Sequence, residues 1–571
     1  MNFLAILKLR SLRENAQPLA LIGLAVILLG IHNGNIPFWD QDEAAYGGFA
    51  LQMHKTGEWW IPDFLWSELH RKPPLQFWLM AGAMQLWGWG EWAARLPSGL
   101  AVLVTGIVVW RWGRDIWGEA IARRAMGLLF TSLLLPVFGK VALTDSLLVA
   151  LETVAMVAMI RAVMTPHWSW SLWLWGAVAL GVLTKGPPIL VLVLGSWGLW
   201  WLGSGFAKAD HGANGHRPRL TALRPWLFAP LSLIPFGVWL ALTYQEDGGE
   251  FARWLWDWYI AHRVGGGVVF GQWGLPGYYL LLFILTFLPW FPWLWAALID
   301  QAQTWRSPKQ LPLTAWIVAG WLIYELLPSK LPSYALGGYP AVALLIAQAS
   351  TMPKLIPRIR WARGLSLLLS LILSLALLLV KRWIPIPFWA LLLTAILSLI
   401  TATLIYRALA RGAMRAAFYG GMVQGATILL CVWGLILPLI LPQLQGSQQV
   451  AKVATNGDRP AMIVFAEDFN LPSLALYVAL GDRPFTVFSG TTAQLAQAFR
   501  ADPAPVVISR RPEQVTQLRQ QIPKLQAQAV TAWFDTLGQP QTYWVLRNGA
   551  DAESPNVPDE SSPATKPIPP A

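Results

Sequence analysis

Three carboxylates fall within four positions of the segment DQDEAAY, at Asp40, Asp42 and Glu43. The segment directly follows a long apolar run, so these acids lie at the edge of a predicted membrane span. Clustered charge is costly beside a bilayer and commonly marks function. Adjacent like charges also raise one another's pKa, which suits a general base or a metal ligand. The alternative is an ordinary solvated loop.

Two cations, Arg71 and Lys72, follow in the same loop and precede Pro73 and Pro74. The prolines favour an extended turn before an apolar segment, which places the cations at the depth of lipid headgroups. A phosphate carried on a lipid is a natural partner for two cations at that depth. The alternative is that both side chains extend from the apolar region to water without a ligand.

Further polar residues occur where other predicted spans end on the same side. Asp145, in ALTDSLL, is either a helix N-cap or a second acid that converges on the first loop. The segment 244–275 contains His262 and Arg263, followed by three glycines that allow a ligand to approach closely. This pair could bind a phosphate or a sugar.

Two short motifs add cations to this side of the membrane. Lys330 and Tyr334 lie in LLPSKLPSYALGGYP, and Lys185 lies in TKGPP. A metal ion would need more convergent ligands than these segments offer. The sequence therefore predicts no cofactor with certainty, and a divalent metal ion stays open although the sequence gives it no support.

The elements that position these residues are membrane spans. The chain has 571 residues, of which 13% are charged and 55% hydrophobic, and its mean hydropathy is +0.47. A soluble protein carries about 25% charged residues. This composition excludes disordered, fibrous, coiled-coil and disulfide-scaffold classes. Apolar runs predict 13 spans, near residues 18–36, 94–113, 125–143, 146–164, 168–184, 186–203, 226–243, 276–298, 312–328, 335–350, 364–380, 387–406 and 417–444.

The surplus of positive charge is a signal of topology. The net charge is +12, yet the basic residues lie mostly in short loops between apolar runs, which argues against nucleic acid as a partner. If segment 74–90 is an interfacial or re-entrant helix, inner loops hold 21 Lys and Arg and outer loops before residue 447 hold 11. This count predicts a cytoplasmic N-terminus and an extracytoplasmic C-terminal segment.

Tryptophan is abundant, with 36 residues. Most of it is expected in an aromatic belt at the membrane interface. The alternative is that some of these rings line a wet, lipid-facing groove. Trp39, Trp59, Trp60, Trp66 and Trp78 concentrate around the acidic loop and the two cations, where a lipid-carried substrate would meet them.

The composition changes near residue 447, where charged residues and glutamine appear. Apolar runs at 462–466, 484–489, 505–509 and 542–546 predict strands, and 472–480, 491–500 and 512–521 between them predict helices. The alternation indicates a small extracytoplasmic α/β domain over 447–548, after a transmembrane catalytic domain over 1–446. The tail 549–571 is rich in Pro, Ser and Asp, and is predicted to be disordered.

Seven motifs follow one another in order: DQDEAAY, GEWWIP, KPPLQFWL, EWAARLPSGL, ALTD, TKGPP and SKLPSYALGGYP. Over most of residues 36–345 the chain resembles bacterial members of glycosyltransferase family 39. That family holds the aminoarabinose transferases that modify lipid A and relatives of the protein O-mannosyltransferases. The resemblance implies a GT-C fold, a polyprenyl-phosphate sugar donor and a catalytic site at the outer membrane face.

The resemblance also implies roles for single residues. Asp42 is the expected catalytic acid residue, with Glu43 beside it, Asp40 as the alternative and Asp145 at the second acidic position. The residues expected at the donor phosphate are Lys72, Arg71, Lys330, Tyr334 and Arg263, and His262 is a candidate for substrate binding. One departure is that aminoarabinose transferases usually have Glu before KPP, where this chain has Arg71. A metal site that uses that carboxylate, and aminoarabinose as the sugar, lose support here.

The predicted function is therefore transfer of a sugar from a polyprenyl phosphate to a lipid A-like glycolipid or another acceptor. Direct attack by the acceptor would invert the anomeric carbon, and no nucleotide is needed. We expect a monomer in the inner membrane. One alternative is an enzyme similar to the protein O-mannosyltransferases. Another, from a different class, is a transporter or flippase of lipid-linked sugars, which would need repeat symmetry and charges at the midplane.

Overall fold

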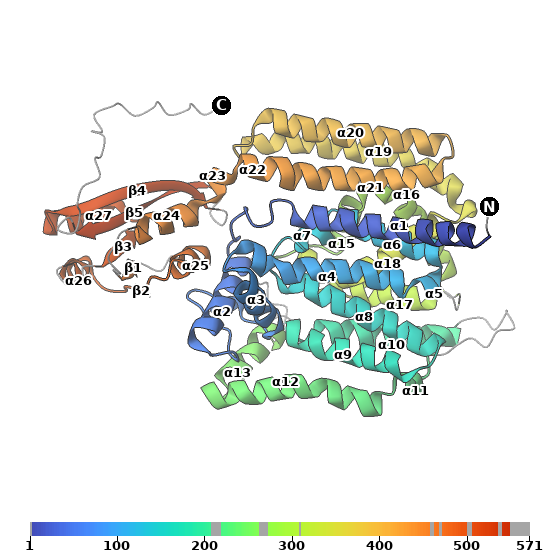
Figure 1. The fold of residues 1–571 in the computed structure, drawn as a ribbon, viewed down its shortest axis with the longest axis horizontal. Coiled ribbons are helices and arrows are strands. Elements are labelled where there is room, and N and C mark those ends of the chain that lie inside the picture. The colour runs from blue at the N-terminus through green and yellow to red at the C-terminus, as the bar shows by residue number, and fades with distance from the viewer. Residues whose placement is uncertain are drawn as a thin grey trace. The chain divides into compact units, whose positions relative to one another are not determined.

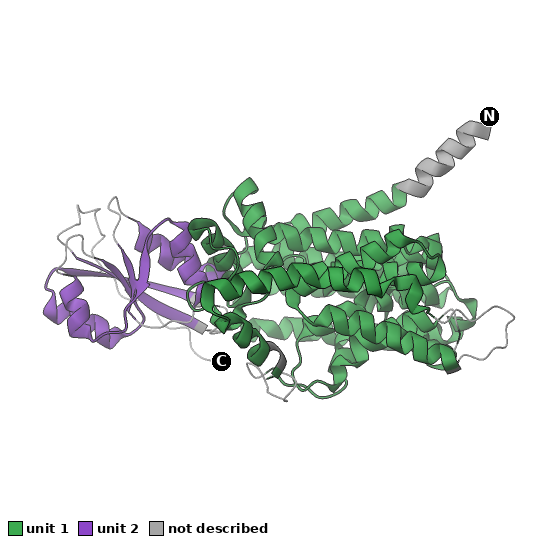
Figure 2. Cartoon of the chain, turned by 90° about the horizontal axis from the view of Figure 1, so that it is seen from below, with its two compact units in different colours: residues 1–442 green, residues 443–571 purple. Residues whose placement is uncertain are grey.

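The computed structural model describes residues 3–206, 218–261, 272–305, 307, 310–456, 462–466, 471–499, 505–534 and 539–548. The chain divides into two compact units, Met1–Pro442 and Gln443–Ala571 (Figure 2). The first unit is built from helices and holds every site residue predicted from the sequence. The second contains the sheet. Each unit is described by itself.

The first unit is a bundle of long apolar helices joined by shorter ones (Figure 1). Its α-helices are α1 (Phe3–Gly30), α2 (Asp42–Thr56), α3 (Leu75–Trp87), α4 (Glu91–Arg111), α5 (Arg114–Trp117), α6 (Glu119–Thr131), α7 (Leu135–Phe138), α8 (Thr144–Met164), α9 (Trp168–Lys185), α10 (Pro188–Phe206), α11 (Leu220–Leu223), α12 (Pro225–Asp247), α13 (Glu250–Trp256), α15 (Tyr278–Thr286), α16 (Phe291–Thr304), α17 (Leu311–Ile317), α18 (Tyr339–Ala349), α19 (Ile356–Leu379), α20 (Phe388–Ala410), α21 (Met414–Cys431), α22 (Leu437–Leu439) and α23 (Leu441–Leu444).

Within the described residues, seven helices are long and apolar enough to cross a membrane, and a bent pair would raise the count to eight. The pair is Tyr278–Thr286 with Leu288–Thr304, bent by 85°. Other predicted spans are interrupted. The one near 125–143 contains the end of α6, a break, and then α7, which has Pro136 in its first turn.

The long helices differ in what they face. The span in α8 is the most buried of the seven, and the spans in α12 and α19 are the least buried. A helix that is apolar on all sides and enclosed by protein belongs to the core. The acids of α8, Asp145 and Glu152, are both buried in that core.

The first loop folds at one end of this bundle, where α2 and α3 lie together (Figure 1). Segment 74–90 forms α3, with 13 residues, which rises only about 20 Å and is short for a span. Gly48 in α2 leaves room for the Phe64 ring, which a Cβ at that position would overlap. This close approach folds the chain after α2 back over the helix and brings residue 70 to the start of α2.

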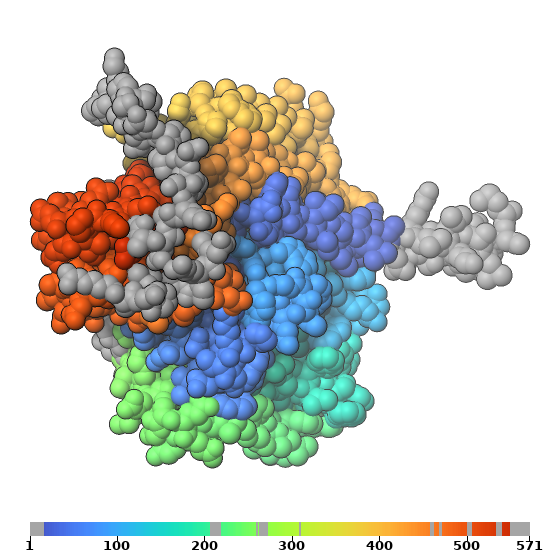
Figure 3. Space-filling model, turned by 60° about the vertical axis from the view of Figure 1, so that its left-hand side comes forward, coloured from blue at the N-terminus to red at the C-terminus, as the bar shows by residue number. Residues whose placement is uncertain are grey.

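Aromatic residues fasten the same loop to α12 and α3. The Trp239 indole donates a hydrogen bond of 2.8 Å to the Trp60 carbonyl, and the Trp78 indole donates one of 2.8 Å to the Trp59 carbonyl. In the space-filling view, the loop (blue) and the α12–α13 region (green) lie side by side (Figure 3). Several loop tryptophans therefore brace the loop, with the amphipathic chemistry expected of rings at an interface.

The second unit has a five-stranded sheet with the order β2-β1-β3-β5-β4. Its strands are β1 (Ile463–Phe465), β2 (Phe485–Val487), β3 (Val506–Ser509), β4 (Leu525–Phe534) and β5 (Gln539–Asn548). Strands β1, β2 and β3 pair in parallel, and β5 pairs antiparallel with both β3 and β4. Its helices are α24 (Gly446–Thr455), α25 (Pro472–Leu480), α26 (Thr492–Ala498) and α27 (Pro512–Gln521).

The long strand β4 was not among the strands predicted from the sequence. Its residues, LQAQAVTAWF, interleave apolar and polar side chains over 525–531, and the longest apolar run, at the end of the strand, has only three residues. Pairing with β5 in the hairpin holds this segment in the sheet. The predicted disordered tail, 549–571, lies outside the described residues.

Candidate active site

Asp42 is the first residue of α2 and lies between two nitrogen groups of the same loop. His70 Nδ1 donates a hydrogen bond of 2.7 Å to Asp42 Oδ1. Lys72 Nζ lies 3.8 Å from the same oxygen. The Asp42 side chain is 55% exposed, so a substrate can reach its carboxylate. We call Asp42, His70 and Lys72 the open cluster.

Lys72 is held from two sides. Its ammonium group lies 4.6 Å from the centre of the Tyr46 ring, which extends from the next turn of α2. The side chain is only 11% exposed. A cation held in one place beside a carboxylate can stabilise a phosphate that arrives at the same point.

The open cluster keeps Asp42 ionised. Burial opposes ionisation, but the charge of Lys72, the hydrogen bond and charge of His70 and the charge of Lys185 outweigh it. The pKa of Asp42 is consequently lowered well below its usual value. A ligand anion that draws Lys72 away would raise that pKa and make Asp42 a stronger base.

Glu43, the next residue, lies in a different environment. Both of its oxygens accept hydrogen bonds from Arg95, at 2.8 and 2.7 Å. They also accept from the Trp39 and Ala142 backbone N–H groups, at 3.0 and 2.6 Å. Arg95 donates further to the carbonyls of Asn33, Ile36 and Pro37. We call Glu43 and Arg95 the sealed cluster.

The predicted catalytic role of Glu43 does not fit this geometry. Its side chain is 2% exposed and that of Arg95 is 1% exposed. A carboxylate that already accepts four hydrogen bonds cannot take a proton from an acceptor without breaking them. Glu43 instead connects the turn before α2 to α4 and to the segment before α8. These contacts fix the start of α2 and therefore the position of Asp42.

Asp145 forms a second ion pair, with Lys185. The Lys185 ammonium donates a hydrogen bond of 2.6 Å to Asp145 Oδ1. Lys185 also lies 5.8 Å from the centre of the Tyr334 ring, and its charge acts on Asp42. The structure therefore brings Asp42, Lys72, Asp145 and Tyr334 into one region, with Lys185 as the link between them.

Two of the predicted phosphate ligands already have protein partners. The Lys330 ammonium donates to the Tyr324 and Glu325 carbonyls, both at 2.8 Å, and its side chain is 1% exposed. Burial lowers the pKa of Lys330, although Glu325 opposes this shift. Arg71 pairs with Asp63. These contacts fit positions that shape the loops better than positions that bind a donor phosphate.

The remaining predicted residues divide into two groups. Asp40 is half-buried and lies just before α2, so it stays the alternative acid. His262 and Arg263 lie outside the described residues, and their roles stay predictions.

The donor set near Asp42 does not suit a metal ion. In the described part of the chain, no three His, Cys, Asp or Glu side chains converge as metal ligands would. The charges of two cations, Lys72 and Lys185, lower the pKa of Asp42. The residue before Lys72 is a third cation, Arg71, and cannot serve as a metal ligand as a carboxylate would. An ammonium group already supplies the positive charge here.

His70 and Lys185 were not predicted as site residues. The sequence held a signal for each, because His70 directly precedes the two cations of the loop and Lys185 stands in the TKGPP motif. A histidine or lysine next to apolar sequence does not by itself reveal its partner. The contacts run over 28 residues for His70 and 40 for Lys185.

Comparison with known proteins finds similarity over part of the chain. Residues 71–206 match the family model described as dolichyl-phosphate-mannose-protein mannosyltransferase. The undecaprenyl phosphate-alpha-4-amino-4-deoxy-L-arabinose arabinosyl transferase of Edwardsiella ictaluri is 26% identical over 54% of this chain and 55% of that protein. The protein of the same description from Pseudomonas savastanoi pv. phaseolicola is 26% identical over 64% and 65%. The match to the first of these relatives thus spans about half of its length.

Solved structures show the fold. ArnT from Cupriavidus metallidurans, bound to undecaprenyl phosphate, aligns with a TM-score of 0.70 at 18% identity, over 96% of this chain and 99% of that chain. The apo form of the same protein gives 0.70 at 17% identity, over 94% and 99%. The chain therefore has the fold of ArnT, and its segment 71–206 matches the mannosyltransferase family model.

Proposed function

We propose that this chain is a membrane glycosyltransferase that moves a sugar from a polyprenyl phosphate to a lipid acceptor. The descriptions of the related arabinosyl transferases and the lipid bound to ArnT support a polyprenyl-phosphate donor. A lipid A-like glycolipid is the acceptor class we favour. The transfer takes place at the outer face of the inner membrane and inverts the anomeric carbon.

The observation that carries this proposal is the open cluster. An exposed, ionised carboxylate lies 3.8 Å from a fixed ammonium group, at the end of an apolar bundle. Inverting transfer needs a base for the acceptor and positive charge for the departing phosphate, close together. The carboxylate of Asp42 can serve as the base, and the ammonium group of Lys72 supplies the positive charge.

In the proposed reaction, Asp42 accepts the proton of the acceptor hydroxyl while that oxygen attacks the anomeric carbon. The bond from the anomeric carbon to the phosphate oxygen breaks, and the electron pair leaves with the phosphate. Lys72 stabilises the negative charge that grows there. Because the phosphate competes for Lys72, donor binding raises the basicity of Asp42 at the moment when a base is needed.

Other residues have supporting roles in this proposal. Asp145 orients Lys185, which contributes positive charge to the site, and Tyr334 packs against that lysine. Arg263 and His262 remain proposed ligands for the phosphate and the sugar. Glu43 and Arg95 position the turn that presents Asp42.

We propose the topology that the charge count predicts. The N-terminus is cytoplasmic, thirteen segments cross the membrane, and the α/β unit over 447–548 is extracytoplasmic. The apolar helices support a chain that crosses the bilayer many times. Single cysteines are introduced at two exposed positions, Lys524 in the α/β unit and Arg411 after α20. Their accessibility to a reagent that does not cross membranes tests the two sides of this assignment.

The family model that matches residues 71–206 favours a second candidate acceptor, a protein hydroxyl. The two acceptors separate in one assay. Purified chain is incubated with a radiolabelled polyprenyl-phosphate sugar and either lipid A or a Ser/Thr-rich peptide. Label in the lipid fraction supports the main proposal, and label in the peptide supports the second. Label in neither fraction, from protein that elutes as a folded species, argues against both.

A further inference from the structure

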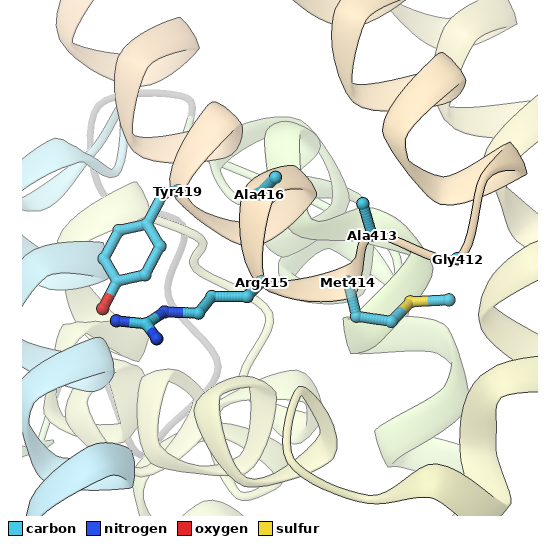
Figure 4. A pocket seen from close by; sticks show the side chains of 6 residues that line it. All are labelled: Gly412, Ala413, Met414, Arg415, Ala416 and Tyr419. Carbon is cyan, nitrogen blue, oxygen red and sulfur yellow. The ribbon is translucent and has the colours of Figure 1, made fainter.

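A basic pocket lies at the end of the bundle opposite α2. It opens where α20 turns into α21 and is lined by Gly412, Ala413, Met414, Arg415, Ala416 and Tyr419 (Figure 4). Figure 1 shows that α2 begins where α1 ends, and that the turn from α20 to α21 lies at the opposite end of the bundle. The proposed sugar transfer makes no use of this pocket.

Arginines gather around the pocket. Arg415 extends over the Tyr419 ring, 6.0 Å from its centre. Arg124, from α6, lies 5.6 Å from the centre of the Phe418 ring. Arg360, from the start of α19, is close enough that its Nη2 would lie 3.4 Å from a Cβ on Gly412. Arg407 and Arg411 are exposed at the end of α20. Three chain segments thus contribute guanidinium groups to one surface.

These charges are not balanced by nearby acids. The sequence has no Asp or Glu between Glu325 and Asp458. Acids elsewhere at this end are engaged, since Asp115 pairs with Arg161, Glu119 with Arg123 and Asp300 with Lys354. In the described part of the chain, Arg360, Arg407, Arg411 and Arg415 form no ion pair with a carboxylate. Burial and then the charges of Arg415 and Arg123 lower the pKa of Arg124, against contacts with Tyr419 that raise it.

An apolar track leads to the arginines along α20. A second open pocket is lined by Ile396, Leu399, Ile400, Thr403, Leu404 and Arg407. These positions recur at the spacing of one helix face and end at Arg407. Ile400 is 50% exposed and Leu404 is 58% exposed. The track is apolar over its length and cationic at its end, which is the pattern of a lipid with an anionic headgroup.

We propose that this surface binds an anionic phospholipid of the leaflet that faces the basic end. The headgroup phosphate contacts Arg407, Arg411 and Arg415, and an acyl chain lies along Ile396, Ile400 and Leu404. Basic pockets between helices bind anionic headgroups in this way. The general preference of cytoplasmic loops for Lys and Arg explains a basic end. It does not require that an arginine stands at the end of an open apolar pocket on the same helix face, as Arg407 does.

The test is lipid retention by the purified full chain. Native mass spectrometry counts phosphatidylglycerol and phosphatidylcholine adducts on the wild type and on the variant Arg411→Gln/Arg415→Gln. The matched control is Lys381→Gln/Arg382→Gln, which removes two exposed cations at the other end of α19 and α20. We expect phosphatidylglycerol affinity to fall about 10- to 30-fold in the first variant and less than about 2-fold in the control. Phosphatidylcholine retention should change in neither.

Two results would overturn the proposal. Equal losses in both double variants would mean that only general surface charge attracts the lipid. Competition by inorganic phosphate at the same concentration as phosphatidylglycerol would mean that the pocket takes a soluble anion. The variant Ile400→Ser/Leu404→Ser separates these cases, because it weakens lipid retention only if an acyl chain occupies the track. The elution profile and the melting temperature of each variant verify that it is folded.

Discussion

Two acids that are neighbours in sequence, Asp42 and Glu43, occupy environments of opposite kind. Asp42 is 55% exposed, and its carboxylate accepts a hydrogen bond from His70 and forms an ion pair with Lys72. Glu43 is 2% exposed and is enclosed by Arg95 and two backbone N–H groups. Successive residues of a helix point about 100° apart, so one side chain faces solvent and the other faces the core. Chemistry and support are therefore assigned by side-chain direction, although the residue types are nearly the same.

The difference explains how the lipid substrate that we propose can meet a precisely positioned site. A buried ion pair contributes little net stability when compared with apolar packing, but removal of one partner is strongly destabilising. The sealed cluster therefore holds the turn before α2 in one arrangement. The open cluster can then exchange its contacts for those of a substrate, because its position does not depend on them.

Asp42→Asn gives the largest expected effect on activity. The amide keeps the shape of the side chain but cannot accept a proton, so transfer should fall about 1,000-fold. The melting temperature should fall only modestly, since the variant loses the ion pairs of Asp42 and ion pairs of an exposed side chain contribute little to stability. The measurement is the rate of label transfer from the polyprenyl-phosphate sugar. Asp63→Asn is the matched control, since Asp63 is 59% exposed and pairs with Arg71. Full activity of the Asp42 variant would refute the proposed base.

Glu43→Gln should act mainly on folding. Removal of the charge leaves Arg95 buried without its counterion, at a cost of about 3 kcal/mol in the free energy of unfolding. Thermal unfolding in detergent measures this effect, and turnover is then expressed per folded molecule. The expected turnover is near that of the wild type. A variant that unfolds at the wild-type temperature but has lost turnover would return Glu43 to the catalytic group.

The sequence was sufficient to predict a helical membrane fold and to select Asp42 as a candidate residue, but it did not reveal the environment of Glu43. The resemblance carried by the motifs over residues 36–345 indicated a GT-C fold, and the sequence placed Asp42 and Lys72 in one loop without predicting their contact. The role of Glu43 was hidden, because Arg95 lies 52 residues further along the chain. Nothing in EWAARLPSGL distinguishes a cation that faces water from one that closes a buried pair.

Lys330 shows the same limit for the phosphate site. A lysine in an outer loop is normally a solvated charge, and the sequence predicted a free donor. Its ammonium group instead donates to two carbonyls just before it in the chain. The backbone course that brings those carbonyls to the lysine depends on tertiary packing, for example on the contact of Lys330 N–H with the Gln272 carbonyl. Short-range sequence patterns do not encode such a contact.

The comparison of Lys72 with Lys330 gives an effect of intermediate size. Lys72→Met should lower the rate of transfer about 100-fold, because the departing phosphate loses its nearest cation. Lys330→Met should lower the melting temperature instead, since it leaves buried carbonyls without a donor. Transfer rates over a range of donor concentrations and thermal unfolding are measured for both. Similar loss of activity in two stable variants would place both lysines at the phosphate.

The smallest expected effect is a change in pH dependence. Because Lys72 and His70 lower the pKa of Asp42, the carboxylate is ionised in the folded protein at every pH above the normal range for aspartate, about 4. Its ion pairs therefore add stability above that pH, and this contribution is lost as the pH falls through the lowered pKa. Between pH 5 and 8 the rate of transfer should therefore not decline through protonation of Asp42. The lower bound, pH 5, lies roughly one pH unit above the ordinary pKa of an aspartate.

Removal of Lys72 should shift the acid-side decline of the transfer rate to higher pH. Without the ammonium group, burial of Asp42 still favours the neutral acid, so its pKa should rise. The residual activity of Lys72→Met should then decline on the acid side at a higher pH than that of the wild type. Arg71→Gln is the control, because Arg71 pairs with Asp63 and leaves the Asp42 contacts in place. An acid limb at the same pH in all three proteins would show that Lys72 does not control the ionisation of Asp42.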